Sequence, residues 1–314
     1  MLVTPESAIS KTFQSFVMRL KARNRLDRIV VDECHVVLSS KNGFRPKLQR
    51  LGELFITATQ FVLLTATLPP QEEHRFWEIM RIPAREVVMF RSPTSRQNIR
   101  YQVVAYDGTD EKAVQFIRAK VQQYAAPGKI VVYSNSVDRV ERLAEMLGCP
   151  SIHANEEDKA EYFQELRQGE HRAVVATNAL GMGVDIPDIR CVVHVDRPRT
   201  LLDYGQESGR AGRDRKASEG IIMRTVCGPA PGVVPNPAAE KIEQFMEGDR
   251  CRRVVLDQYM DGRQSREGCE EGEEPCDVCH GRRGGVFEDS AGAEDENPQD
   301  EADRIEFQRQ QRER

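Results

Sequence analysis

Short runs rich in valine and isoleucine alternate with amphipathic stretches through the first 225 residues, and this alternation limits the possible folds more than any other feature. The runs are bounded by polar residues or glycine, as strands buried in a parallel sheet are. Strands that alternate with helices predict an α/β fold with parallel sheets. We expect strands at Ile29–Val31, Phe61–Leu64, Val103–Tyr106, Ile130–Tyr133, Val174–Ala176 and Cys191–Val195, and helices at Glu111–Tyr124, Ser136–Leu147 and Glu156–Arg167.

Two interruptions divide this pattern. Ser-Pro-Thr-Ser breaks it within Arg91–Asn98, and a segment rich in proline and glycine follows Val226, where neither a helix nor a central strand can continue. After Gly281 the sequence is acidic and almost free of core-forming residues, which predicts disorder. These boundaries predict units at residues 1–92, 93–225 and 226–281, followed by a disordered acidic tail at 282–314.

Charge and hydropathy limit the partners of the chain. The formal net charge is -5, and the ten Asp and Glu against six Arg in Gly281–Arg314 account for -4 of it, which leaves about -1 on residues 1–280. A near-neutral body can present a basic groove, but overall charge gives no support for nucleic-acid binding. No run of about 18 apolar residues occurs, so we expect no transmembrane helix and no membrane partner.

An apolar strand ends in two adjacent carboxylates in the sequence Ile-Val-Val-Asp-Glu-Cys-His at residues 29–35. This is the Walker B arrangement of nucleotide hydrolases, in which Asp32 would hold Mg²⁺ through water and Glu33 would activate the attacking water. Adjacent carboxylates after a strand are also common as a plain solvated strand end. The following Cys-His favours the nucleotide site, because DECH is a variant of the DEAH box of helicases.

A second motif begins 30 residues after His35, where Thr65, Ala66 and Thr67 follow an apolar run. Small hydroxyl residues at this place resemble the helicase motif that links nucleotide state to domain movement. In isolation, Thr-Ala-Thr is equally compatible with an ordinary strand end. Its position downstream of the DECH segment favours the helicase interpretation.

The most specific motif is Gln-Glu-Ser-Gly-Arg-Ala-Gly-Arg-Asp at residues 206–214. It sets Arg210 and Arg213 three residues apart, and the flanking Gly209 and Gly212 would let the backbone come close to phosphates. An arginine that reaches a γ-phosphate raises the rate of hydrolysis about 10³–10⁵-fold. Glycine-rich arginine segments can also be plain turns, but the full nine-residue string is too specific for that interpretation alone.

Together these motifs resemble the RecQ family of superfamily 2 DNA helicases, in order and at matching spacing over about residues 1–280. The sequence DECHVVL is most similar to the divergent RecQ-like helicases of fungi. Further similar segments are Leu2–Glu6 ahead of the DEAH-type box, Phe44–Pro46 at the end of the aromatic-rich loop, Asn98–Tyr101 at the entry into the second RecA-like domain, and Ala176–Asp185 ahead of the arginine motif.

The resemblance implies a partial first RecA-like domain at residues 1–92, a complete second RecA-like domain at 93–225 and a small helical zinc-binding subdomain at 226–281. It also implies ATP-dependent 3′→5′ DNA unwinding, with ATP and Mg²⁺ between the two RecA-like domains, single-stranded or forked DNA crossing both, and a nuclear location, although no targeting signal is visible. The implied roles are hydrolysis for Asp32, Glu33 and Arg213, nucleotide or interdomain contact for His35, Asp185, Gln206, Gly209, Arg210 and Gly212, and coupling or DNA contact for Arg45, Thr65, Ala66, Thr67, Thr177, Gly181 and Gly183.

Four of the eight cysteines crowd into residues 251–279, in the last third of the chain. Without a secretory signal, a metal site is favoured over a disulfide framework. Four thiolates, two of them in a Cys-X-X-Cys pair, suit a closed tetrahedral zinc site, and the alternative is reduced cysteines in a loop. The resemblance implies that Cys251, Cys269, Cys276 and Cys279 bind one structural Zn²⁺.

The pattern departs from the family at the phosphate-binding loop. No GxxxxGK[ST] sequence occurs, and Gly128-Lys129 leads directly into a predicted strand. The family places this loop upstream of the Val-Thr-Pro-Glu motif, so the resemblance predicts an N-terminally truncated helicase that is inactive alone. The loop before Phe44 also lacks the family's Trp and His. A zinc-stabilised remnant that binds DNA or a partner without catalysis, and an inert product of a decayed gene, remain open alternatives.

Overall fold

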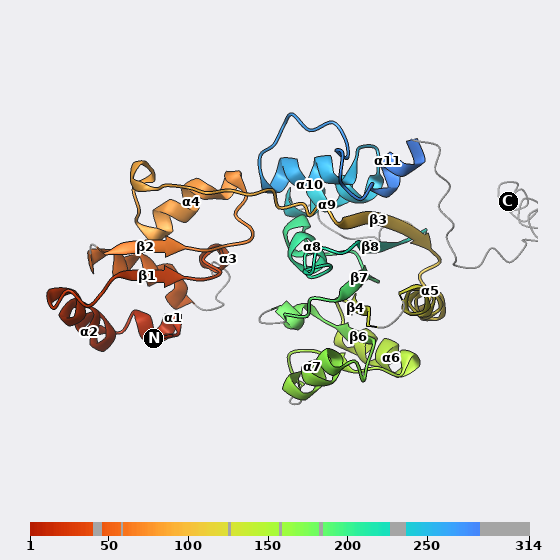
Figure 1. Cartoon of the computed structure of the whole chain (residues 1–314), viewed down its shortest axis with the longest axis horizontal. Helices are drawn as coiled ribbons and strands as arrows, with labels where there is room; N and C mark the ends of the chain where they lie inside the picture. Colours follow the sequence, from red (N-terminus) through yellow and green to blue (C-terminus); the bar gives the residue numbers. More distant parts are fainter. Residues whose placement is uncertain are drawn as a thin grey trace, which may run out of the picture.

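The computed structural model describes residues 1–39, 46–57, 59–124, 127–156, 159–181, 185–226 and 237–282. Strands β3-β8-β7-β4-β6-β5, in that order, form a larger parallel sheet, and β1 and β2 form a smaller parallel sheet (Figure 1). The predicted α/β fold with parallel sheets and flanking helices is therefore confirmed. Of the predicted acidic tail, only Arg282 is among the described residues.

The larger sheet is built by alternating strands and helices. Its central strands carry β-branched residues that favour the pleated backbone, and helices begin at capping residues such as Thr109 and Thr200, whose side chains accept a backbone N–H. Its elements are β3 (Ile99–Tyr106), α5 (Asp110–Gln123), β4 (Lys129–Tyr133), α6 (Val137–Leu147), β5 (Ser151–Ile152), α7 (Lys159–Gln168), β6 (Ala173–Ala176), η4 (Asn178–Gly181), β7 (Ile189–His194), α8 (Leu201–Ser208) and β8 (Ser218–Thr225).

The core lies on both faces of this sheet. Every residue of β4 and β7 is buried, and successive side chains point to opposite faces. Val131 and Val192 pack on the face covered by α8 and the C-terminal helices, whereas Ile130 and Val193 pack on the face covered by α5 and α6. This two-sided burial explains why the strands appear in the sequence as nearly continuous apolar runs.

The smaller unit surrounds β1 and β2, which pair in register from Arg28 opposite Gln60 to Val31 opposite Leu63. Its core includes Phe76 and Met80 of α4, both fully buried. The elements are α1 (Pro5–Ala8), α2 (Lys11–Ala22), β1 (Arg28–Val31), α3 (Val36–Ser39), η2 (Pro46–Thr57), β2 (Gln60–Leu63), α4 (Pro70–Met80) and η3 (Ala84–Glu86).

A C-terminal module, residues 237–282, covers the β3 edge of the larger sheet (Figure 1). Asp277 Oδ2 accepts the Val103 N–H of β3 over 3.0 Å, and two hydrogen bonds of 2.7 and 2.8 Å join the same carboxylate to Arg252. The module consists of α9 (Pro237–Glu247), α10 (Arg252–Met260) and α11 (Asp277–Arg282). None of the helices in the described part of the chain has the length and apolar character needed to span a membrane.

Sequence patterns located most strands but missed two. Strand β8 was not predicted, and β3 begins at Ile99, four residues before the predicted start. Polar residues hid β8: Glu219 is buried there because it pairs with Lys120 over 2.9 Å and accepts from Gln102 over 2.9 Å. The short strand β5 has only two residues and carries too little pattern to be predicted.

Candidate nucleotide and metal sites

The two carboxylates of the predicted nucleotide site follow β1 directly. Asp32 and Glu33 are both exposed at the carboxyl end of the strand. The Glu33 N–H donates to Asp32 Oδ1 over 2.9 Å, and Glu33 has a φ of 49°, in the left-handed region that residues other than glycine rarely adopt. The chain therefore turns sharply after β1 and leaves both carboxylates accessible to solvent.

His35 joins the DECH segment to the Thr-Ala-Thr segment. Because β1 and β2 are parallel neighbours, their carboxyl ends meet, and His35 Nδ1 lies 2.9 Å from Thr65 Oγ1. Glu33 Oε2 lies 3.4 Å from the same nitrogen. The Thr65 hydroxyl donates to Thr67 O over 3.2 Å and accepts the Thr67 N–H over 3.1 Å, with Ala66 between them in a bend. The two predicted motifs of the smaller unit thus form one polar network.

Gln206, in α8 of the larger unit, completes this network from the other side. Its Nε2 lies 3.0 Å from His35 Nε2 and donates to Thr67 Oγ1 over 2.6 Å. An amide nitrogen can only donate, so His35 Nε2 accepts and the ring proton is assigned to Nδ1, which faces Thr65 and Glu33. Burial lowers the pKa of His35, and the Glu33 carboxylate opposes this shift. Burial thus favours the neutral ring that the contact with Gln206 requires.

The glycines of the arginine motif have structural partners of their own. Arg96 donates to Gly209 O over 3.0 Å and to Gly212 O over 2.6 Å, and Asn98 Nδ2 donates to Gly212 O over 2.9 Å. Gly212 has a φ of 56°, and a Cβ built on it would lie 2.3 Å from Asn98 Nδ2. Close approach of the segment before β3 therefore requires this glycine, independently of any phosphate.

The two arginines of the motif differ in their surroundings. Arg210 is buried beside Tyr133, where burial raises the pKa of the tyrosine and the guanidinium opposes that rise. Arg213 is exposed, and its Nη1 lies 2.8 Å from Asp185 Oδ1. Gln206 thus reaches the smaller unit in this arrangement, whereas Arg213 pairs within its own unit.

The remaining predicted residues lie at the carboxyl end of β6 or outside the described residues. Thr177 follows β6, is buried, and donates its N–H to Ile152 O over 3.0 Å. Gly181 ends η4. Arg45 and Gly183 lie outside the described part of the chain. Their predicted contacts with DNA stay predictions.

The four predicted metal ligands come together. The Cys251, Cys269, Cys276 and Cys279 sulfurs all lie within 4.8 Å of one another. Cys251 Sγ is 3.6 Å from Cys269 Sγ and 3.7 Å from Cys276 Sγ. Tetrahedral zinc with Zn–S bonds of about 2.3 Å separates its sulfurs by about 3.8 Å, so the cluster has the size and donor set of a zinc site. A metal needs these thiols as thiolates, so its binding would release their protons.

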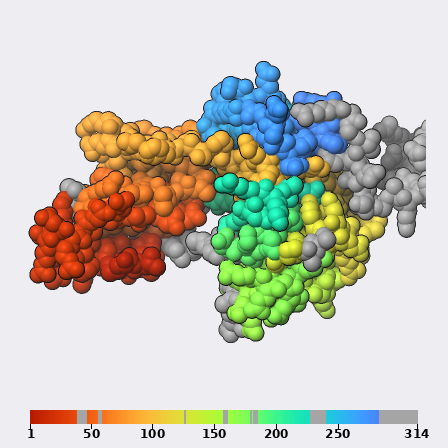
Figure 2. All heavy atoms as spheres, in the orientation of Figure 1, coloured from red at the N-terminus to blue at the C-terminus, as the bar shows by residue number. Residues whose placement is uncertain are grey.

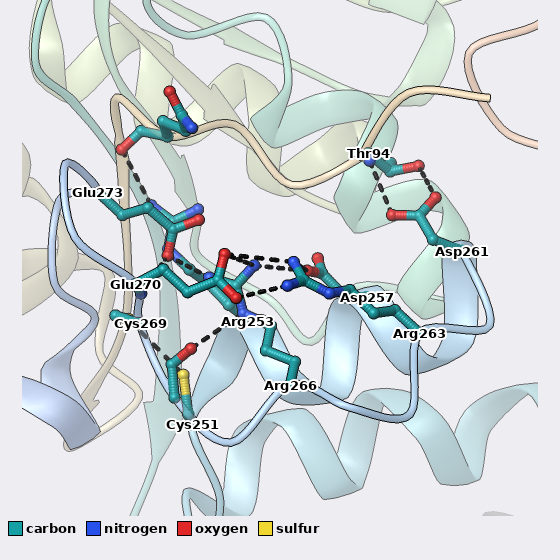
Figure 3. Close-up of polar contacts among 12 residues, drawn as sticks. Thr94, Cys251, Arg253, Asp257, Asp261, Arg263, Arg266, Cys269, Glu270 and Glu273 are labelled. Atoms are coloured by element: carbon teal, nitrogen blue, oxygen red, sulfur yellow. Dashed lines mark hydrogen bonds and ion pairs between the residues drawn. The ribbon is translucent and has the colours of Figure 1, made fainter. Parts of the chain in front are cut away.

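A buried ionic network beside these cysteines was not predicted (Figure 3). Arg253 is fully buried, its guanidinium lies 5.0 Å from the centroid of Tyr101, and its Nε is 3.5 Å from Glu273 Oε2. Arg266 pairs with Glu273 and, over 2.6 Å, with the fully buried Asp257. Sequence patterns gave no sign of burial for these charges, because the pairs join α10 to the polar segment that follows it only in the folded chain.

The pair of His194 and Glu207, the residue that follows Gln206, is a second polar group that the sequence did not predict. His194 ends β7, is 2% exposed, and its Nε2 lies 2.8 Å from Glu207 Oε2. Its ring stacks on Tyr133 with centroids 5.2 Å apart. These side chains line a pocket with Asn135 and Asp196. A histidine at the carboxyl end of a buried parallel strand was the available signal.

The larger unit matches the family model of the helicase conserved C-terminal domain over residues 111–215. A solved structure of Saccharomyces cerevisiae Dbp5 bound to RNA and ADP BeF3 is similar with a TM-score of 0.54 and 18% identity, covering 74% of this chain and 61% of that chain. The Mycobacterium smegmatis helicase Lhr bound to ssDNA and AMP-PNP gives a TM-score of 0.50 and 22% identity, covering 74% and 33%. The larger unit thus carries a helicase conserved C-terminal domain, and the chain shares its fold with these two structures.

Sequence identity to curated proteins indicates which helicases the chain resembles. The chain is 32% identical over 232 residues to ATP-dependent DNA helicase Q5 of Mus musculus, covering 69% of this chain and 24% of that protein. It is 28% identical over 297 residues to ATP-dependent DNA helicase RecQ of Pasteurella multocida, covering 88% and 45%. The chain is therefore a relative of the RecQ-type helicases, as predicted. It spans between a quarter and just under half of the length of these relatives.

Proposed function

We propose that this chain supplies the Walker B carboxylates, the second RecA-like domain and the zinc module of an ATP-dependent 3′→5′ DNA helicase of RecQ type. The observation that carries the proposal is the double contact of Gln206 with His35 and Thr67. It joins the nine-residue arginine motif to the DECH and Thr-Ala-Thr segments, which are the elements that must communicate when hydrolysis moves one domain against the other.

In this mechanism Glu33 accepts a proton from the attacking water, and Asp32 would hold Mg²⁺ through water at the strand end. ATP with Mg²⁺, when bound, would supply the γ-phosphoryl group that passes to that water, with ADP as the leaving group. Arg213 leaves Asp185 and stabilises the developing phosphate charge when the domains close. The pair with Asp185 is exposed, so exchanging this partner costs little. Gln206 transmits this domain movement to the smaller unit through its hydrogen bond with Thr67.

DNA, single-stranded or forked, crosses both RecA-like domains in this proposal. The side chains assigned to DNA contact and coupling are Arg45, Thr65, Thr67 and Thr177, with Gly181 and Gly183 allowing close approach of the backbone. Contacts of this kind go mainly to the sugar-phosphate backbone and carry little sequence preference. The nuclear location also stays a prediction.

The zinc assignment is part of the same proposal. Cys251, Cys269, Cys276 and Cys279 would hold one Zn²⁺ with no open position, so the metal stabilises the module and takes no part in hydrolysis. The spacing of the four sulfurs and their four-thiol donor set support this assignment.

A second candidate function is a zinc-stabilised module that binds DNA without turning over ATP. One observation favours it: none of the 314 residues forms a GxxxxGK[ST] phosphate-binding loop. Under this alternative the Gln206 contact is a retained structural feature that has no role in hydrolysis.

ATP hydrolysis separates the two candidates. We expect no turnover by the purified chain, and DNA-stimulated turnover by a chimera that places the P-loop segment of Pasteurella multocida RecQ ahead of Leu2. In the chimera, Glu33→Gln should abolish turnover and Arg213→Ala should lower it about 10³–10⁵-fold. Arg215→Ala, a change at an exposed arginine two residues away, is the matched control and should leave the rate unchanged.

Two results would count against the proposal. Hydrolysis that continues in the Glu33→Gln chimera would remove the assigned role of the DECH segment. A chimera that folds and binds single-stranded DNA in fluorescence anisotropy, yet never hydrolyses ATP, would favour the binding module. DNA-stimulated turnover by the unmodified chain would require a different phosphate-binding element.

A further inference from the structure

The two units are joined by the linker, Arg91–Asn98. The linker contains no helix or strand but is held by side chains along its length. Arg91 fixes its first end. Nη1 donates to Leu68 O over 2.9 Å and to Met260 O over 3.1 Å, and Nη2 pairs with Glu73 over 2.5 Å. One guanidinium therefore ties the smaller unit, at the residue after Thr67, to the last residue of α10.

The middle of the linker is held by Asp261, which follows α10 directly (Figure 3). Its Oδ2 accepts the Thr94 N–H over 2.8 Å, and its Oδ1 accepts the Thr94 hydroxyl over 2.6 Å. Both oxygens of the carboxylate are thus used on a single linker residue. Hydrogen bonds to a charged acceptor are about twice as strong as neutral ones.

The last part of the linker rests on Arg253, in the first turn of α10. This guanidinium is fully buried and donates to Arg96 O over 2.8 Å, to Gln97 O over 3.2 Å and to Ile99 O over 2.7 Å. Figure 2 shows the blue C-terminal module lying against the chain that leads from the smaller unit into β3. Helix α10 therefore contacts the linker from its first turn to its last.

The same helix also packs against α8, which carries Gln206. A Cβ built on Gly205 would lie 2.6 Å from Met260 Cε and 3.8 Å from Leu256 Cδ1, so the two helices approach closely at the residue before Gln206. On the other side, a Cβ on Gly262 would lie 3.1 Å from Pro70 Cγ at the start of α4. The end of α10 thus contacts both units.

These contacts close a ring around the candidate site. Gln206 bonds to Thr67, the next residue Leu68 bonds to Arg91, Arg91 bonds to Met260, and Met260 packs on the residue before Gln206. We expect a change at one member of this closed ring to affect the others, because residues that share contacts are energetically coupled and the hydrogen bonds of the ring are short and partly buried.

We propose that Arg91 and Asp261 are positioning residues that hold the linker on α10 and thereby set Gln206 against His35 and Thr67. Neither residue touches the nucleotide site itself. The zinc ligand Cys251 immediately precedes α10, so the metal cluster is joined to the linker through one rigid helix. This inference goes beyond the proposed function and does not depend on it, since it concerns the arrangement of the units without ATP or DNA.

Hydrogen exchange of the whole chain tests the proposal. In Asp261→Ala, the Thr94 amide should exchange at least about tenfold faster, because its acceptor is lost. Peptides covering residues 64–68 and 204–207 should also exchange faster, by about threefold or more, although they lie outside the mutated contact. Asp261→Asn keeps an acceptor for the Thr94 N–H and a donor for its hydroxyl, so it should restore all three rates to within about threefold of wild type.

Arg263→Ala is the matched control. It removes ion pairs with Glu270 and Asp257 inside the module, neither of which reaches the linker, and it should leave residues 64–68 and 204–207 at wild-type rates. If Asp261→Ala fails to fold, Thr94→Val tests the same contact, because it removes only the hydroxyl and should produce a smaller rise at the same peptides. The proposal is wrong if either folded variant accelerates exchange only at residues 92–98, or nowhere, or if Arg263→Ala accelerates residues 64–68 and 204–207 equally.

Discussion

The two sheets of this molecule are built from similar residues yet differ in what surrounds them. Every position of β4 and β7 is buried, whereas Val30 in β1 is 53% exposed and Leu64 just after β2 is 47% exposed. The central strands of the larger sheet have neighbours on both sides and helices on both faces. The smaller sheet pairs only β1 with β2 among the described strands. Apolar composition therefore does not determine burial; the number of neighbouring elements does.

The candidate site lies between these two unequal units. The larger unit presents Gln206 from a helix packed on a deep core, while His35 and Thr67 belong to a unit with a smaller core. Contacts of the smaller unit with the linker and with α10 therefore contribute a larger share of its order. Loss of these contacts should therefore affect the smaller unit more than the larger one.

The largest effect should come from the metal ligands. Cys276→Ser removes a thiolate from the cluster, and structural zinc contributes about 10–16 kcal/mol of apparent binding free energy in small metal-dependent folds. We expect loss of bound zinc and rapid hydrogen exchange throughout α10 and α11. Exchange should rise more in β1 and β2 than in β4 and β7. Cys149→Ser, at a half-buried thiol outside the cluster, should retain one zinc per chain.

Zinc content by atomic absorption and exchange by mass spectrometry check this prediction. Equal acceleration in both sheets would show that the module stabilises the two units alike, and the comparison drawn above would be wrong.

A matched pair of valine substitutions should give the next largest effect. Val192→Ala in β7 deletes fully buried methyl groups, and we expect a loss of about 2 kcal/mol in the free energy of unfolding, from lost burial and the cavity left behind. Val30→Ala in β1 should cost about 0.5 kcal/mol or less, because that side chain is half exposed. Urea denaturation of both variants measures the difference, and similar losses would mean that Val30 is covered in solution.

The smallest effect should be a dependence on pH. Burial lowers the pKa of His35 in the folded chain below its ordinary value of 6.5. The unfolded chain then binds more protons as the pH falls, so the stability that this histidine contributes is present above pH 6.5 and is lost as the pH drops below it. Protonation of Nε2 also removes the acceptor used by Gln206.

Thermal melting between pH 7.5 and pH 5 measures this dependence against His35→Asn, which cannot titrate in that range. We expect the wild-type chain to lose more stability on acidification than the variant. Identical pH profiles would indicate that His35 does not control the contact between the units.

Much of the fold could be predicted, because strands that are buried on both faces appear in the sequence as apolar runs. Ile130–Tyr133 was found almost to the residue as β4, whereas β8 was missed because Glu219 and Arg224 flank its apolar centre. The free-energy cost of burying Glu219 is offset only because Lys120 and Gln102, which belong to other elements, pair with its carboxylate. Local patterns contain no information about such distant partners.

The candidate site was predicted in part for a related reason. The spacing of the motifs named His35, Thr67 and Gln206, and the structure joins them in one network. The glycines of the arginine motif were assigned to phosphates, yet Gly212 is also required by the approach of Asn98. The roles of Arg91 and Asp261 could not be predicted, since 169 residues separate Arg91 from Met260, the acceptor on α10.

Strand β3 lies at the end of the strand order, and an edge strand with free backbone groups is a template for pairing with another copy of the same chain. Asp277 takes the Val103 N–H, and the Glu274 N–H donates to Gln97 O just before the strand. The module that follows the sheet therefore also covers part of this edge, so a variant in which the module loses its order should have a stronger tendency to self-associate.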